Sequence, residues 1–108
     1  MAGQENIALT EAVYYILLSL TQPLHGYGIM QKVDEMSHGR LRMAAGTLYG
    51  ALSSLQDKGW IEALSGAADS RKKEYILTQA GCAVLDKELQ RLEELVNNGH
   101  TVLGGQTK

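Results

Sequence analysis

The sequence predicts a mainly α-helical fold with a small β-hairpin: a winged helix-turn-helix followed by one C-terminal helix. Four segments repeat apolar residues with a period near 3.6. Two short β-type runs around a Gly-containing turn lie between the third and fourth of these segments. The length of 108 residues suits one domain. The expected divisions are a loose N-terminus over 1–8, the winged helix-turn-helix over 9–78, the C-terminal helix over 79–99 and a loose tail over 100–108.

The first helix is predicted over residues 11–20, because Thr10 is a good N-cap and apolar residues follow at helical spacing. Pro23 lies in the break after it. The second helix is predicted over 26–37, and the Ser-His-Gly sequence at 37–39 ends it.

The residues that open the second helix have expected local roles. His25 is expected to cap the helix or hydrogen-bond locally, and Tyr27 is expected in the core. Gly26 and Gly46 are expected to serve a close backbone approach or a turn.

The third helix is predicted over residues 45–58, and Gly59 closes it. It follows a short extended link over 40–43. Its buried stripe is expected to comprise Leu48, Ala51, Leu52 and Leu55, and its opposite side Thr47, Gly50, Ser53, Ser54 and Asp57.

A β-hairpin follows, with strands predicted over 60–64 and 72–77 and a turn region over 66–69. Three helices followed by a hairpin match the plan of a winged helix-turn-helix, in which the third helix enters the major groove of DNA.

The fourth helix is predicted from its cap, Thr78, to about residue 98, with Gly99 as its stop. Its apolar residues are spaced 3, 4, 3 and 4, as in a two-heptad coiled-coil seam. An amphipathic helix must bury its stripe. Pairing with a second chain, also against the first helix, is favoured over packing on its own domain alone. The seam comprises Cys82, Leu85, Leu89, Leu92 and Val96, widened by Leu95, and the charged outer positions are Asp86, Lys87, Glu88, Arg91, Glu93 and Glu94.

Charge is unevenly distributed along the chain, although the net charge is only −2. Residues 38–73 carry six Lys or Arg and three acids, whereas residues 1–37 carry one Lys and four acids. A cationic band in an acidic protein indicates contact with a polyanion, or else a solvated face.

Other classes of protein fit the sequence poorly. A single Cys allows no internal disulfide, which favours a reducing cytoplasm. No apolar run is long enough for a membrane span. The three His are scattered and no nucleophile or phosphate-binding motif occurs, so neither an enzyme nor a metal or cofactor site is expected.

Several stretches resemble the PadR-like family of transcriptional regulators. They are PLHGYGI at 23–29, GTLYGALSSLQDKGWI at 46–61 and RKKEYILTQAG at 71–81, with the spacing of the first helix as a weaker fourth sign. The likeness spans about residues 9–95. It implies a homodimeric repressor that binds double-stranded DNA at palindromic operators, as in the shorter branch of the family. Members often release DNA when a small molecule binds.

The sequence departs from the family at the wing. Asp69-Ser70 stands where a Gly-Arg pair is common, and Glu74 stands where an aromatic residue is common. A weaker grip of the wing on DNA is therefore expected.

The candidate DNA contacts belong to the third helix, its flanks and the wing. Hydroxyls in the first helical turn can bind phosphates, small residues allow close approach to the groove, and Lys and Arg neutralise phosphates. No Arg or Asn is present in mid-helix for bidentate base reading, so shape and water are expected to contribute to specificity. The candidates are Arg40, Arg42, Thr47, Tyr49, Gly50, Ser53, Ser54, Lys58, Arg71, Lys72 and Lys73, and the dimerisation candidates are Leu85, Leu89, Leu92, Leu95 and Val96.

Some residues have two interpretations. Tyr49 is favoured as a DNA contact over an edge-of-core residue. Cys82 is expected to be buried and inert rather than an oxidant sensor, and Trp60 to pack rather than stack a ligand. An alternative function for the chain is a winged-helix adaptor that binds another protein and no DNA.

Overall fold

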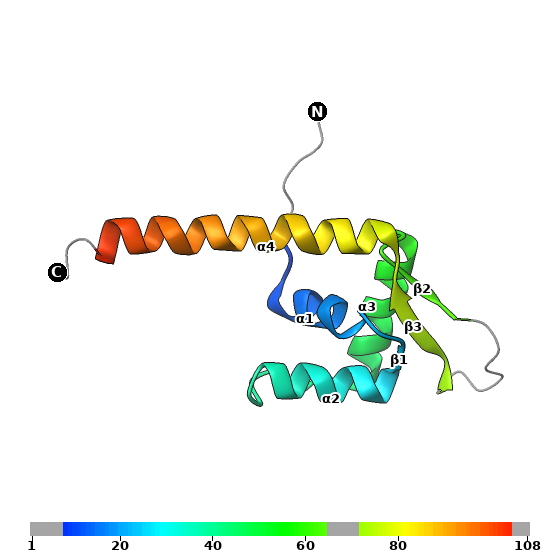
Figure 1. Ribbon diagram of the computed structural model, residues 1–108. Helices are drawn as coiled ribbons and strands as arrows, with labels where there is room; N and C mark the ends of the chain where they lie inside the picture. Colours follow the sequence, from blue (N-terminus) through cyan, green and yellow to red (C-terminus); the bar gives the residue numbers. More distant parts are fainter. Residues whose placement is uncertain (1–7, 65–71, 105–108) are drawn as a thin grey trace.

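The computed structural model describes residues 8–64 and 72–104. The four predicted helices and the hairpin follow the predicted order, with one additional strand between the first two helices, and the fold is mainly helical with a small antiparallel sheet (Figure 1). The elements are α1 (Glu11–Ser19), β1 (Leu24–His25), α2 (Gly26–Met36), α3 (Ala45–Asp57), β2 (Ile61–Ala63), β3 (Glu74–Leu77), α4 (Gln79–Gly99) and the π-helical turn η2 (His100–Gly104).

Side-chain caps fix where three of the helices begin. The Thr10 hydroxyl accepts the backbone N–H of Val13 at 3.1 Å, and α1 starts at the next residue. The Thr78 hydroxyl caps α4 in the same way. His25 Nδ1 accepts the N–H of Gly28 at 3.2 Å, which confirms the local capping role expected of this histidine.

Left-handed residues end α2 and α3. Gly59 has φ +78°, and the N–H groups of Gly59 and Trp60 donate to the carbonyls of Gln56 and Leu55. This pair of bonds is a Schellman motif. The end of α2 repeats it, with His38 at φ +55° and Gly39 at φ +83°.

The sheet has three strands in the order β1-β3-β2, one more than the predicted hairpin. We call the β2–β3 hairpin the wing. Ile61 pairs with Leu77 between β2 and β3, and His25 pairs with Glu74 between β1 and β3. The two-residue strand β1 therefore joins the wing to the start of α2.

The core lies between the three short helices, the sheet and the first part of α4. Each fully buried Leu or Ile stabilises the fold by about 1.5–3 kcal/mol. The predicted stripe of α3 is confirmed, because Leu48, Leu52 and Leu55 are buried and Ala51 is half-buried. The other buried apolar residues are Ile16, Leu17, Leu20, Ile29, Val33, Ile61, Tyr75 and Leu85.

Two predictions for α2 and α3 are wrong. Tyr27 is not in the core, since 62% of it is exposed. The buried face of α2 runs through Gly26, Ile29 and Val33, and a residue next to Gly26 is turned about 100° away from that face. Gly46 serves no close approach, because a Cβ built there has no neighbour within 4 Å.

The inner face of α4 also differs from the predicted seam. The residues of α4 that are buried are Gly81, Leu85 and Glu88. Cys82 was expected to be buried and is exposed, whereas Glu88 was expected on the outer face and is only 4% exposed. Glu88 is buried because it binds the chain before α1, a contact that heptad spacing does not contain. Cys82 is exposed because the buried face of α4 passes through Gly81, and the next residue is turned about 100° away from it.

The last helix is longer than predicted. It continues past Gly99 through η2, so residues 100–104 are helical instead of a loose tail. Its C-terminal half extends beyond the rest of the domain (Figure 1), and the molecule measures 58 × 37 × 21 Å. No helix in the described part of the chain is long and apolar enough to span a membrane.

Candidate nucleic-acid interface

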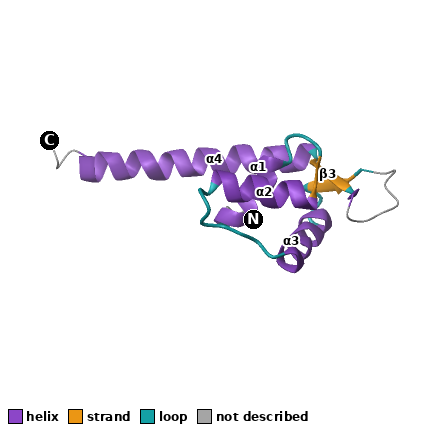
Figure 2. Ribbon diagram, turned by 90° about the horizontal axis from the view of Figure 1, so that it is seen from below, coloured by secondary structure: helices purple, strands orange, loops and turns teal. Residues whose placement is uncertain are grey.

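The outward face of α3 is polar, narrow and uncovered. Figure 2 shows α3 at the edge of the domain, with no other helix on its outer side. A Cβ built at Gly50 has no neighbour within 4 Å, so space is open there. All five residues predicted for the outer side are exposed: Thr47, Gly50, Ser53, Ser54 and Asp57. This face is shaped to approach a surface closely.

Tyr49 is half-buried at the edge of the core. A Cβ on Gly26 would clash with the Tyr49 hydroxyl and lie 2.7 Å from its Cζ atom, which confirms the close approach expected at Gly26. The ring thus packs on the start of α2. This position supports the packing interpretation of Tyr49, and its contact with DNA stays a prediction.

The two arginines between α2 and α3 are already paired with acids. Arg40 forms an ion pair with Glu11, and its hydrogen bond lowers the pKa of that carboxyl. Arg42 Nε lies 3.7 Å from an Asp34 carboxylate oxygen. All four side chains are substantially exposed, so these pairs contribute little to stability. DNA phosphates would have to compete with the two carboxylates for these guanidinium groups.

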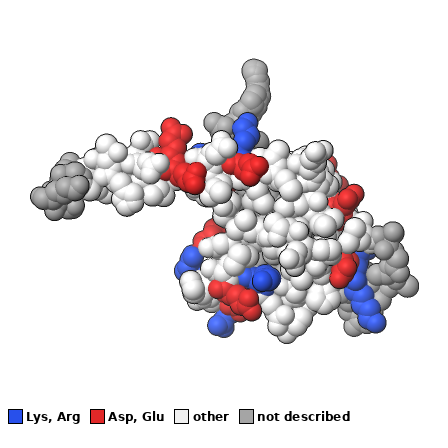
Figure 3. Space-filling view, in the orientation of Figure 1, with Lys and Arg blue, Asp and Glu red and all other residues white. Residues whose placement is uncertain are grey.

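The remaining candidate cations surround the wing and the end of α3. Lys58 lies 5.7 Å from the centre of the Trp60 ring, a cation–π distance. Lys72 is exposed and Lys73 half-buried at the start of the returning strand, while Arg71 lies outside the described residues. Figure 3 shows Lys and Arg atoms next to residues that are not described, and others mixed with acids further along the same face. Of the cationic candidates that the structure describes, Arg40 and Arg42 are paired with acids, whereas Lys58, Lys72 and Lys73 form no ion pair.

Trp60 is half-buried and packs against the core. Its carbonyl accepts the N–H of Thr78, and a Cβ on Gly81 would clash with that carbonyl. These contacts agree with the packing role expected for Trp60. The predicted wing tip, including Asp69-Ser70, lies outside the described residues. Among the residues that are described, no cluster of three or more His, Cys, Asp or Glu could hold a metal ion.

Comparisons with known proteins agree with this geometry. A sequence profile of the transcriptional regulator PadR-like family matches residues 15–87. The transcriptional regulator Rv3488 of Mycobacterium tuberculosis is 35% identical over 85 residues, which cover 78% of this chain and 74% of that protein.

The chain belongs to the PadR-like family of transcriptional regulators.

Other relatives extend this finding. An uncharacterized 37.1 kDa protein in a Streptomyces fradiae transposon is 34% identical over 86 residues, which cover 79% of this chain but only 24% of that protein. The crystal structure of a PadR family regulator from Eggerthella lenta has a TM-score of 0.67 at 24% identity, covering 84% of this chain and 80% of that one. A PadR-like regulator from Bacillus cereus has a TM-score of 0.67 at 19% identity, covering 86% and 89%. The chain is thus a transcriptional regulator with the PadR fold rather than an enzyme.

A second surface of this PadR-like regulator lies on α4. Leu89, Leu95 and Val96 are exposed, Leu92 is half-buried, and Leu85 packs in the core of its own chain. Val102 and Leu103, which the seam did not include, continue the exposed apolar set at 58% and 64% exposure. The C-terminal half of α4 therefore presents an exposed apolar surface, which is typical of a surface that binds another protein.

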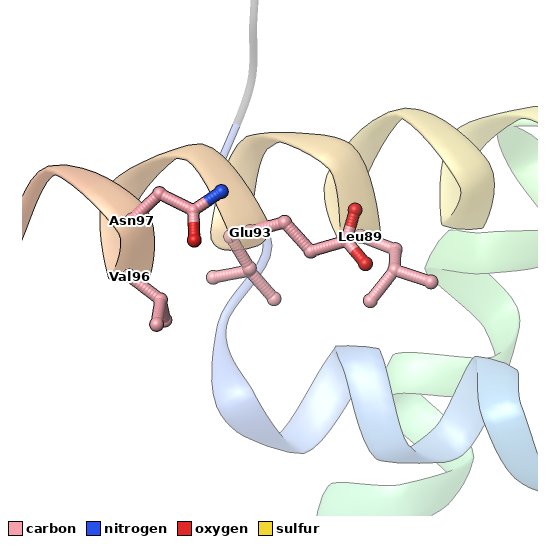
Figure 4. Close-up of a pocket in the computed structure, with 5 residues that line it drawn as sticks. Leu89, Glu93, Val96 and Asn97 are labelled. Atoms are coloured by element: carbon pink, nitrogen blue, oxygen red, sulfur yellow. The ribbon is translucent and has the colours of Figure 1, made fainter. Parts of the chain in front are cut away.

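A hollow of about 530 Å³ runs along this part of α4. Figure 4 shows Leu89 and Val96 extending from α4 on the side that faces α1. The lining residues are Leu89, Leu92, Glu93, Val96 and Asn97. Three of them are dimerisation candidates, so the hollow belongs to the predicted dimer surface.

Sequence reasoning missed Glu88 and Tyr27. Glu88 lies between Leu85 and Leu92 on one side of the helix, and this position inside an apolar stripe was the signal for its burial. Gly26 lies on the buried face of α2, together with Ile29 and Val33. Helical spacing along these positions would have placed the next residue, Tyr27, on the outside.

Proposed function

We propose that this PadR-like regulator is a homodimer that binds a palindromic operator in double-stranded DNA and represses transcription, with α3 in the major groove. The uncovered face of α3 carries the proposal, because small residues on a firmly anchored helix can reach the groove floor. The buried stripe Leu48, Leu52 and Leu55 anchors that helix.

The exposed apolar part of α4 supports the dimer. Leu89, Leu95, Val96, Val102 and Leu103 are between 47% and 64% exposed, and a second copy of the same helix would cover them. A two-fold axis through this contact would match the symmetry of a palindrome.

We further propose that a small molecule releases the protein from DNA. The hollow on α4 combines apolar side chains with the carboxylate of Glu93 and the amide of Asn97. A small apolar molecule with one or two polar groups suits such a lining.

A gel shift with the DNA upstream of the protein's own gene tests the proposal. We expect a salt-sensitive complex with a palindromic sequence. Changing Lys72 to Ala should reduce the slope of log Kobs against log salt by about 0.9 for each phosphate that the lysine neutralises. Changing Gln90 to Ala, on exposed α4 surface, should leave the slope unchanged. A complete lack of binding at low salt would contradict DNA binding.

One observation favours the adaptor as a second candidate. Arg40 and Arg42 are each paired with an acid, which reduces the cationic surface free for DNA. An adaptor would bind no DNA at low salt and would still dimerise, so the same gel shift separates the two functions.

A further inference from the structure

Tyr27 lies where three elements of the candidate interface meet. It is the second residue of α2 and follows Gly26, which contacts the Tyr49 ring on α3. His25 pairs with Glu74 at the start of β3. Figures 1 and 2 both show the start of α2 beside α3 and β3.

The phenol of Tyr27 is free to bind another molecule. The residue is 62% exposed, more than any other tyrosine that the structure describes. Within residues 8–64 and 72–104 no group forms a hydrogen bond with its hydroxyl. A single exposed aromatic is ordinary on a protein surface. This one lies between the wing and α3, the helix proposed to enter the major groove, and that position gives it significance.

The position also determines which part of DNA it would meet. In a helix-turn-helix the second helix of the pair enters the major groove, while the first crosses the sugar-phosphate backbone. Here α3 is the second helix and α2 the first. The exposed Thr47 belongs to α3, and the exposed Lys72 comes two residues before β3; α3 and β3 both adjoin the start of α2. A group between them would face the strand that borders the groove.

We propose that Tyr27 binds the DNA backbone, its hydroxyl donating a hydrogen bond to a phosphate oxygen beside the groove that α3 enters. This inference rests on the proposed function. Tyrosine hydroxyls commonly make such positioning contacts, which fix the register of a protein on DNA and carry no sequence information. The hydroxyl is uncharged and neutralises no phosphate, so the contact releases no counterion of its own.

The test compares Tyr27→Phe, Tyr27→Ala and Tyr14→Phe with the wild-type dimer, on the operator and on unrelated duplex DNA. Tyr14→Phe is the matched control, because it removes a hydroxyl from a half-buried ring on α1, 6.2 Å from Tyr15. Removing one hydrogen bond to a charged phosphate oxygen should weaken binding about 10- to 150-fold. We expect this loss on both DNAs for Tyr27→Phe, with an unchanged salt slope and thermal unfolding, and none for Tyr14→Phe.

The outcomes separate the two proposals. If both Tyr27 variants bind both DNAs as tightly as the wild type, the inference is wrong and the proposed function stands. If only operator binding weakens, the tyrosine contacts a base and the backbone assignment is wrong. If the wild type binds neither DNA at low salt, the proposed function itself fails.

Discussion

At the scale of single residues, Glu88 is the charged side chain most enclosed by the described part of the domain. Its carboxylate accepts the backbone N–H of Leu9 at 3.1 Å and binds Arg91 at 2.8 and 2.7 Å. These bonds connect α4 to the chain just before α1, 79 residues away. A carboxylate so enclosed is stabilised only while these partners remain in place.

The pKa of Glu88 is lowered, chiefly by its hydrogen bonds with Arg91. A carboxyl with a depressed pKa in the folded state stabilises the fold above its unfolded pKa, near 4.3, and loses this effect as the pH falls through the folded value. We expect Glu88→Gln to lower the free energy of unfolding by about 1–3 kcal/mol at pH 7 and by much less at pH 3.

Urea unfolding from pH 7 to pH 3 measures this effect. Glu94→Gln is the control, since Glu94 is exposed on the same helix and has no ion pair with any described residue. A Glu88→Gln deficit that stays constant across this pH range would show that the missing contribution is packing rather than charge.

At the scale of elements, α4 packs against its own domain with its first half and leaves apolar residues exposed on its second half. Leu85 and Glu88 face the domain, while Leu89, Leu95 and Val96 remain exposed. The first half of α4 is thus anchored to the domain, and its second half is the surface on which the proposed dimer depends.

Changing Leu89 to Asp should therefore disrupt the proposed dimer. A charge in the middle of an apolar contact has to be desolvated without a partner, so we expect monomers and operator binding at least 100-fold weaker. Sedimentation with circular dichroism distinguishes a folded monomer from an unfolded chain. Gln90→Asp places the same charge on the neighbouring exposed position and should stay dimeric. An intact Leu89→Asp dimer would refute the role of α4.

How much of these elements the sequence predicts depends on whether the signal is local. Thr10, Thr78 and Gly59 mark helix ends within one or two residues, because each cap acts on its own turn. The strand β1 has only two residues and is defined by its pairing with β3, so no sequence periodicity predicts it. The burial of Glu88 depends equally on a distant backbone group.

The candidate site follows the same division. The outer face of α3 was predictable because helical spacing alone separates it from the stripe of Leu48, Leu52 and Leu55. The pairing of Arg40 with Glu11 was not, since it joins the link after α2 to the start of α1. Tyr27 shows that a motif can be found while the direction of one side chain within it is missed.

At the scale of the whole molecule, the proposed dimer fixes the distance between two copies of α3. Helix-turn-helix dimers read half-sites one helical turn apart, about 10–10.5 base pairs between centres. Inserting five base pairs between the operator halves should turn one half-site to the opposite side of the duplex and reduce affinity to that of a single half-site. Inserting ten base pairs restores the facing but lengthens the separation by about 34 Å. Gel shifts with these three operators measure the effect, and equal affinity for all of them would contradict a rigid two-fold dimer.

The central place of β3 in the sheet links the two ends of this molecule. Leu77 N–H donates to the Leu20 carbonyl, Thr78 N–H donates to the Trp60 carbonyl, and α4 begins at the next residue. No loose linker separates the long helix from the strand. We therefore expect a tilt of α4 to shift β3 and, through the pairing of β1 with β3, the start of α2. This short backbone connection would transmit a force applied to the far end of α4 to the opposite end of the domain.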